Sequence, residues 1–337
     1  MVTLSDGALA DFSRFSLYNS PYVAHDEGCA IDLYPASESA RAPDGGAERS
    51  GERERTGDAR AAADASRAAS RVTRAPSPVD GEVVETRTVD APPKPYAVEH
   101  DHLVVVDTGE HLARILHVDP AVEPGDEVAV GDPLGDLVRS GFFAPWVGNH
   151  VHLGFRERDA DPLRASGSLP VSVDVAVDPV PWDGSGRVVQ QGETYVVLDA
   201  PDHPAPGERF AGIEAGDGVV LDGGFPHYEG GGALRVRRTH PGESDGDGSS
   251  RNGAVEDGAT SDEAASGRAD EVPVSLAGQR VGVAHGRTVA WDDVEVRANG
   301  TPITGVSLFV SRDEFGAKLV CPGHDFSTGE RVEVTVG

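Results

Sequence analysis

Two histidines separated by one residue, His150 and His152, have the spacing in this sequence that is best suited to chemistry. The surrounding residues, Asn149-His150-Val151-His152-Leu153, are typical of a β-strand. Alternate side chains of a strand point to the same face, so the two imidazoles lie about 7 Å apart on one side while Val151 and Leu153 face a core. Imidazole is both a metal ligand and an acid or base. The pair predicts a metal or catalytic site, against the simpler alternative of two exposed strand histidines.

Three other side chains extend this set: His25, Asp32 and His117. Asp32 lies between apolar residues in the predicted strand Ala30–Tyr34, and a carboxylate in that position faces a site or a partner unless the strand forms a solvated edge. His117 comes near the end of another predicted strand, directly before Val118-Asp119-Pro120. By itself it is an ordinary strand-end histidine.

The elements that must position these residues are strands. Short apolar runs are separated by turn signals, such as Pro124-Gly125-Asp126 and Val130-Gly131-Asp132, and little helical periodicity lies between them. This pattern predicts an all-β fold, with an N-terminal sandwich or barrel-like domain and a C-terminal β domain. The expected domains are residues 1–165 and 166–337. The predicted strands are 30–34, 79–84, 103–107, 113–118, 150–153, 171–177, 187–189, 195–198, 219–221, 280–283, 294–297, 306–310, 318–320 and 331–336.

Two segments, residues 36–75 and 241–271, contain almost no large apolar side chains. Such segments cannot offset the entropy cost of ordering, so we expect both to be disordered surface segments without a chemical role.

The charge of the chain excludes one class of partner. The formal net charge is -28, from 57 acidic and 29 basic residues, and only Lys94 and Lys318 are lysines. No basic stripe is present to neutralise phosphates, so we expect no nucleic-acid partner. An acidic surface nearly free of lysine is typical of a halophilic protein, whose self-repulsion is screened by salt.

The two cysteines, Cys29 and Cys321, form no framework or metal-binding pattern and are expected to be buried free thiols. The N-terminus lacks a basic segment followed by an apolar one, and no apolar run approaches 18 residues. We therefore expect a cytoplasmic protein without a membrane span.

Taken in order, these motifs resemble the lysostaphin/LytM-type zinc endopeptidases, which have a duplicated hybrid motif fold. The resemblance covers residues 22–165 with the segment 36–75 set aside, and its most specific part is the ordered set of a His–Asp pair, an intermediate His and a terminal HxH. The motifs are AHDEGCAIDLYP, PVDGEVV, RILHV, GDEVAVGDPLG and HVHLGF.

The resemblance implies one zinc ion bound by His25, Asp32 and His152, with an open fourth position for water. His150 and His117 would flank that water as the catalytic residues, and the substrate would be a peptide or amide. The donor types are normal for catalytic zinc, which activates water and polarises a carbonyl.

The sequence departs from the family at the first ligand. The family places its first histidine four residues before the aspartate, but here that position is Gly28 and His25 precedes Asp32 by seven. An odd separation puts two side chains on opposite faces of a regular strand, so His25 reaches the site only if Asp26-Glu27-Gly28 turns or bulges. Cys29 is a possible substitute, although its separation of three is also odd. A second departure is the bulky segment 142–146, which narrows or reshapes the expected substrate groove.

Two other functions are compatible with the sequence. One is a catalytically inactive relative, in which the β scaffold binds a ligand or a protein. The other is a phosphohistidine carrier, since such carriers have a related β scaffold and a His pair.

Overall fold

The computed structural model describes residues 1–36, 74–164, 166–216, 218–235, 271–313 and 315–337. These residues form an all-β protein, as predicted, with 27 strands, a short 3-10 turn η1 (Gly7–Leu9) and one four-residue α-helix, α1 (Val23–Asp26). No helix in the described ranges has the length and apolar character needed to cross a bilayer.

The strands form four sheets. The two-stranded sheet contains β1 (Val2–Ser5) and β12 (Val171–Asp174), and the three-stranded sheet contains β4 (Arg74–Pro76), β10 (Pro133–Leu137) and β8 (Val118–Pro120). From one edge to the other, the ten-stranded sheet contains β13 (Val177–Val180), β16 (Phe210–Ile213), β25 (Val310–Ser311), β2 (Phe12–Ser16), β3 (Ala30–Pro35), β11 (Val151–Glu157), β7 (His111–Leu116), β6 (His100–Asp107), β5 (Gly81–Asp90) and β9 (Glu127–Val128). In the same sense, the twelve-stranded sheet contains β19 (Glu271–Leu276), β20 (Gln279–His285), β21 (Thr288–Trp291), β18 (Gly230–Arg235), β17 (Val219–Phe225), β24 (Gly305–Leu308), β26 (Lys318–Val320), β15 (Tyr195–Leu198), β14 (Ser185–Gln191), β27 (Arg331–Val336), β22 (Val296–Ala298) and β23 (Thr301–Pro302).

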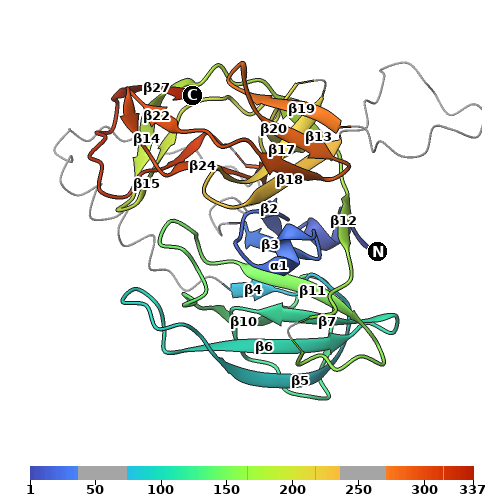
Figure 1. Cartoon of the computed structure of the whole chain (residues 1–337). Coiled ribbons are helices and arrows are strands. Elements are labelled where there is room, and N and C mark those ends of the chain that lie inside the picture. Colours follow the sequence, from blue (N-terminus) through green and yellow to red (C-terminus); the bar gives the residue numbers. More distant parts are fainter. Residues whose placement is uncertain (37–73, 165, 217, 236–270, 314) are drawn as a thin grey trace, which may run out of the picture.

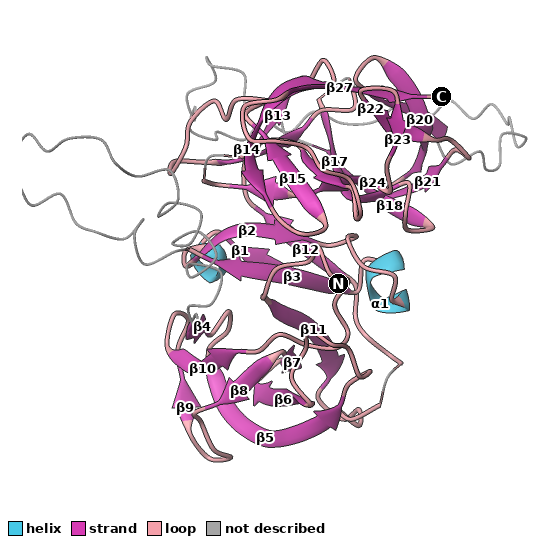
Figure 2. Ribbon diagram, turned by 90° about the vertical axis from the view of Figure 1, so that its left-hand side faces the viewer, coloured by secondary structure: helices cyan, strands magenta, loops and turns pink. Residues whose placement is uncertain are grey.

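The ten-stranded sheet contains strands from both halves of the chain. Strand β2 pairs with β25, with Phe15 opposite Val310, while β1 pairs with β12 in parallel. Figure 1 shows the result: β2 and β3 lie between the C-terminal strands and the strands β5–β7 and β11. The view in Figure 2, turned by 90°, shows the same order.

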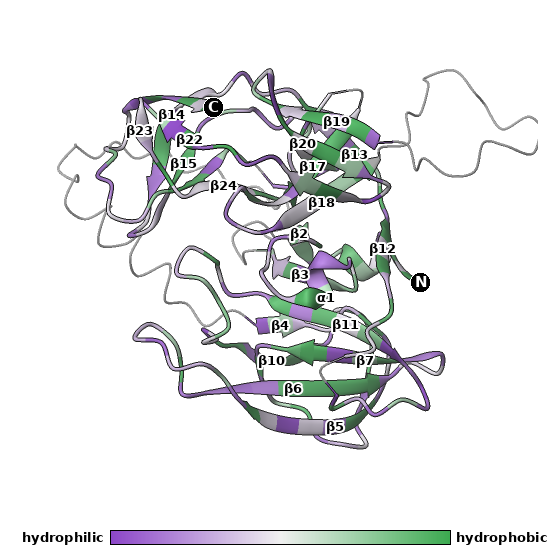
Figure 3. Cartoon of the chain, viewed as in Figure 1, coloured by the Kyte–Doolittle hydropathy of each residue, from purple (hydrophilic) through white to green (hydrophobic). Residues whose placement is uncertain are grey.

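The strands enclose two hydrophobic cores, and the first includes residues of both halves, such as Phe15 and Phe210. One core is built around residues of β2, β3, β6, β7 and β11, and the other around residues of β14, β15, β17, β20 and β27. Figure 3 colours the chain by hydropathy and shows apolar stretches along strands of both parts of the molecule. Phe15 and Ile31 of the first core and Leu221 and Leu319 of the second are fully buried. Burial of these apolar residues drives the sheets to pack.

Most of the strands expected from apolar runs are confirmed, and those at 195–198, 318–320 and 331–336 have the predicted bounds. The predicted disordered segments lie mostly outside the described residues. At their ends the prediction was wrong, because Arg74 and Ala75 belong to β4 and Glu271 begins β19. Pairing with β10 and β20 satisfies the backbone of these residues despite their composition. Cys29 and Cys321 are buried and unbridged, as expected.

Candidate metal centre

Strand pairing brings two of the predicted ligands together. Asp32 of β3 lies directly opposite His152 of β11, and residues opposite each other in a sheet share a face. His152 Nδ1 lies 3.0 Å from Asp32 Oδ1. Val151 and Leu153, on the other face of β11, are fully buried in the core. The predicted alternation along this strand is confirmed.

His25 reaches the same point through a turn. It lies in α1, and the chain then reverses at Gly28, whose φ of 63° is in the left-handed region. A Cβ on this residue would lie 2.5 Å from the hydroxyl of Tyr18, so the turn requires glycine. His25 Nε2 consequently lies 3.2 Å from Asp32 Oδ1 and 3.2 Å from His152 Nδ1. The odd separation of His25 and Asp32 is therefore resolved by the helical turn at α1.

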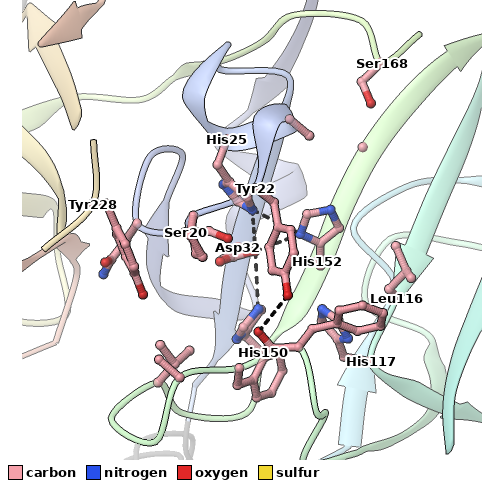
Figure 4. Close-up of a pocket in the computed structure, with 18 of the residues that line it drawn as sticks. Ser20, Tyr22, His25, Asp32, Leu116, His117, His150, His152, Ser168 and Tyr228 are labelled. Carbon is pink, nitrogen blue, oxygen red and sulfur yellow. Dashed lines mark hydrogen bonds and ion pairs between the residues drawn. The ribbon is translucent and has the colours of Figure 1, made fainter. Parts of the chain in front are cut away.

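The three donor atoms have the geometry of a metal centre. His25, Asp32 and His152 form a group that could hold a metal ion, which we call the metal group (Figure 4). Zinc with donors at 2.0–2.2 Å in a tetrahedron requires them to be about 3.3 Å apart. The observed separations of 3.0, 3.2 and 3.2 Å are close to this value, so the residues fit the ion.

Hydrogen bonds outside this group orient its rings. His25 Nδ1 donates to the carbonyl of Leu17 at 2.6 Å, which leaves Nε2 free to bind a metal. Asp32 is buried, and although desolvation favours its neutral form, the surrounding histidines, His150 first, hold its pKa well below the ordinary value. Burial lowers the pKa of His152 to about 4. Asp32 is therefore a carboxylate and His152 is neutral at pH 7, which is the state that ligands require.

The carbonyl of Leu17 is itself held by the C-terminal half. Asp222 of β17 is completely buried and accepts hydrogen bonds from the backbone N–H groups of Leu17, at 2.6 Å, and Tyr18, at 3.2 Å. The hydroxyl of Ser16 donates to the same carboxylate at 2.5 Å. Asp222 therefore orders the segment whose carbonyl orients His25.

The two predicted catalytic histidines flank the metal group. His150 precedes β11 and is buried; its Nδ1 donates to the carbonyl of Gly148 at 2.9 Å, and its Nε2 lies 3.3 Å from Asp32 Oδ1. The centroids of the His117 and His152 rings are 5.7 Å apart. All five predicted site residues line one cavity of about 200 Å³.

His117 belongs to a buried hydrogen-bonded chain. Its Nδ1 donates to Asp101 Oδ2 at 2.5 Å, and Ser140 donates to the same oxygen. Burial lowers the pKa of His117, although Asp101 opposes this shift. The ring is therefore neutral at pH 7, with Nδ1 protonated and Nε2 available to accept a proton.

Part of the remaining cavity wall is aromatic. Phe143 stacks on His150 with centroids 4.4 Å apart, and the hydroxyl of Tyr22 donates to the carbonyl of Phe142 at 3.4 Å. Tyr228, from the C-terminal half, lies on the opposite side of the metal group from His117 (Figure 4). The bulky segment that starts at Phe142 therefore lies against the predicted site.

Two family models match this chain. The N-terminal domain of a domain of unknown function, DUF8155, matches residues 3–68 and 56–173, and the C-terminal domain of DUF8155 matches residues 178–337. The chain belongs to the DUF8155 family. A comparison with curated proteins finds no match. The N-terminal DUF8155 domain contains all five predicted site residues, and the C-terminal DUF8155 domain supplies Asp222 and Tyr228.

Sequence reasoning missed several residues of this site. Asp101 lies at the start of an apolar strand. A carboxylate beside apolar strand residues is the same feature that identified Asp32, so Asp101 could have been found from the sequence. Asp222 and Tyr228 had no such signal, because their distance along the chain hides the contact. Cys29, the possible substitute for His25, does not belong to the metal-binding group found among the described residues.

Proposed function

We propose that this protein is a zinc-dependent hydrolase of peptide or amide bonds, related to the lysostaphin/LytM-type endopeptidases. The observation that carries the proposal is the convergence of donor atoms from His25, Asp32 and His152, each within 3.2 Å of the other two. The resemblance in motif order supports it independently.

Residues of the protein then take separate chemical roles around the zinc ion. When bound, zinc lowers the pKa of water and polarises a carbonyl. His117 accepts a proton at Nε2, because its Nδ1 proton is held by Asp101. His150 lies beside Asp32 and orients or stabilises the reacting oxygen. The aromatic side chains of the cavity wall lower the local dielectric, which strengthens these polar interactions.

A ligand-binding relative without activity is the second candidate. It is favoured by Phe143, whose ring covers one face of His150 and narrows the space in which a substrate could reach that imidazole. Zinc binding alone does not separate the two candidates, because an inactive relative can retain the ion. Hydrolysis does.

Metal content tests the proposal first. Protein purified without a metal-affinity tag should contain one zinc per chain by elemental analysis, and His152→Ala should lose it because one of three ligands is gone. His111→Ala, a histidine of the same sheet outside the cavity, is the control and should keep zinc. Two histidines and one carboxylate also bind iron in oxygenases, so stoichiometric iron, or no metal, would contradict the assignment.

A second variant tests the division of roles. His150→Ala should keep one zinc per chain and lose hydrolysis of a peptide library by at least about 100-fold, since removing one group that stabilises the developing oxyanion costs that much. The two measurements are elemental analysis and detection of new peptide termini by mass spectrometry. Loss of zinc together with activity would make His150 a ligand and overturn the assigned role; a zinc-loaded wild-type protein that cleaves nothing would favour the binding module.

A further inference from the structure

One end of the cavity carries an arginine that has no carboxylate partner among the described residues. Arg114 of β7 lies opposite Gly154 of β11, just as Leu116 lies opposite His152. All four residues line the cavity. Because Gly154 is two residues beyond His152 on the same face, Arg114 extends from the sheet about 7 Å further along the strand than the metal ligand.

The charge of Arg114 is not neutralised within the described part of the chain. Its side chain makes no ion pair there, and its buried Nε has no hydrogen-bond partner. Burial lowers the pKa of Arg114 to about 10, with a smaller contribution from the positive charge of Arg156. The guanidinium is therefore still protonated at pH 7.

A second donor lies at the same end of the cavity. Ser168 lines it, and its Oγ accepts a hydrogen bond from the guanidinium of Arg156. A hydroxyl that accepts from one side retains its own proton to donate to a ligand. Arg156 is itself buried and is anchored by the carbonyl of Arg164 at 3.1 Å. Arg114 and Ser168 thus provide two donors with a further positive charge beside them.

The only carboxylate among the described residues lining this cavity is Asp32, which belongs to the metal group. We propose that Arg114 and Ser168 form a carboxylate-binding subsite, which selects peptides bearing a carboxylate within one or two residues of the cleaved bond. This inference rests on the proposed hydrolase function for the position of the cleaved bond. The carboxylate is either the free carboxyl terminus of the peptide or an acidic side chain.

Binding of three matched probes tests this subsite. The probes are acetyl-Phe-Gly with a free carboxylate, the same peptide as its carboxamide, and the carboxamide with Glu in place of Gly. Calorimetry on the zinc-loaded full chain at constant ionic strength should give an affinity about 10- to 100-fold higher for at least one carboxylate probe than for the neutral carboxamide, since hydrogen bonds to charged groups have that strength. A higher affinity for the free acid would identify a terminal carboxylate as the ligand. A higher affinity for the Glu probe would identify an acidic side chain.

Variants assign the effect to Arg114. Arg114→Gln should remove the preference and leave the affinity for the carboxamide within about twofold. Arg87→Gln, an exposed arginine of the same sheet outside the cavity, should leave the preference unchanged. Equal affinities of the wild-type protein for all three probes would overturn the inference even if Arg114→Gln does not fold, and so would a preference that survives in a folded Arg114→Gln protein.

The result for the carboxylate-binding subsite can be distinguished from the result for the proposed hydrolase activity. An Arg114-dependent preference without hydrolysis would support the subsite and reject the enzyme. Hydrolysis that is indifferent to the carboxylate and to Arg114 would support the enzyme and reject the subsite.

Discussion

At the scale of single residues, the site depends on which imidazole nitrogen carries a proton. His25, His117 and His150 each donate from Nδ1 to an oxygen of the protein, which leaves Nε2 of each ring for chemistry. His152 differs, because its Nδ1 faces the metal group. The oxygens that select these tautomers come from Leu17, Asp101 and Gly148, so they determine which ring nitrogen faces the cavity.

Asp101→Asn tests whether the oxygen that orients His117 matters for catalysis. Burial, opposed by Asp101, keeps the pKa of His117 below 6.5, so the neutral ring is present at pH 7 and is lost only as the pH falls through that lowered pKa. Removing the carboxylate's charge lowers the pKa of His117 further. The acid limb of kcat/KM should move to lower pH, while the rate at pH 7 falls about 10- to 100-fold because the ring is less well oriented.

The measurement is a pH–rate profile beside that of Asp107→Asn, a control on the same strand. An acid limb that moves to higher pH, or an unchanged rate at pH 7, would remove Asp101 from the mechanism.

At the scale of elements, two strands and one turn build the metal group. Strand pairing aligns Asp32 with His152, while α1 and Gly28 deliver His25. A four-residue helix is not stable by itself, so its position depends on the contacts around it. The buried carboxylate of Asp222, from β17, supports one such contact, because it binds the backbone of Leu17 and Tyr18, and the Leu17 carbonyl accepts a hydrogen bond from His25 of α1.

Asp222→Ala should therefore weaken zinc binding although the residue lies outside the metal group. We expect the zinc affinity to fall about 10- to 100-fold, measured by competition with a chelator, because the Leu17 carbonyl no longer holds His25 in place. Asp222→Asn retains an acceptor for the two N–H groups and should keep most of the affinity. Asp292→Ala, at an exposed ion pair of the C-terminal half, is the control. Equal zinc affinity of Asp222→Ala and wild type would show that the turn is held without this contact.

At the scale of the whole molecule, the two halves of the chain share one sheet and one cavity. Pairing of β2 with β25 joins them, and Tyr228 brings the C-terminal half to the cavity wall. The expected domains, 1–165 and 166–337, remain a prediction. The attachment of the C-terminal half nevertheless has a physical consequence, since it positions both the backbone behind His25 and part of the pocket.

The net charge of -28 makes stability depend on salt. Raising KCl from 0.1 to 1 M shortens the Debye length from about 10 to 3 Å, which screens repulsion between exposed carboxylates. We expect Tm to rise, by about 3–4 °C for each 2 kcal/mol gained in a chain of this size. Thermal unfolding followed by circular dichroism would measure this, with sucrose at equal osmolality as the uncharged control. A Tm that is independent of KCl would contradict a halophilic origin of the composition.

The sequence by itself determined the fold class and the identity of the candidate ligands. Strand periodicity and turn residues are local properties, and they predicted an all-β chain and the inward and outward faces of β11. Residue types, their spacing and the resemblance in motif order nominated His25, Asp32, His117, His150 and His152.

Only the tertiary structure decided that these residues meet. The odd separation of His25 and Asp32 would put them on opposite faces of a regular strand. The turn that reconciles them packs Gly28 against Tyr18, and His25 binds the carbonyl of Leu17, whose N–H donates to Asp222, 205 residues further along the chain. The same holds for Arg114, whose place in the cavity follows from its pairing with Gly154. Long-range contacts leave no local pattern in a single sequence, because burial and strand pairing arise only when distant segments come together.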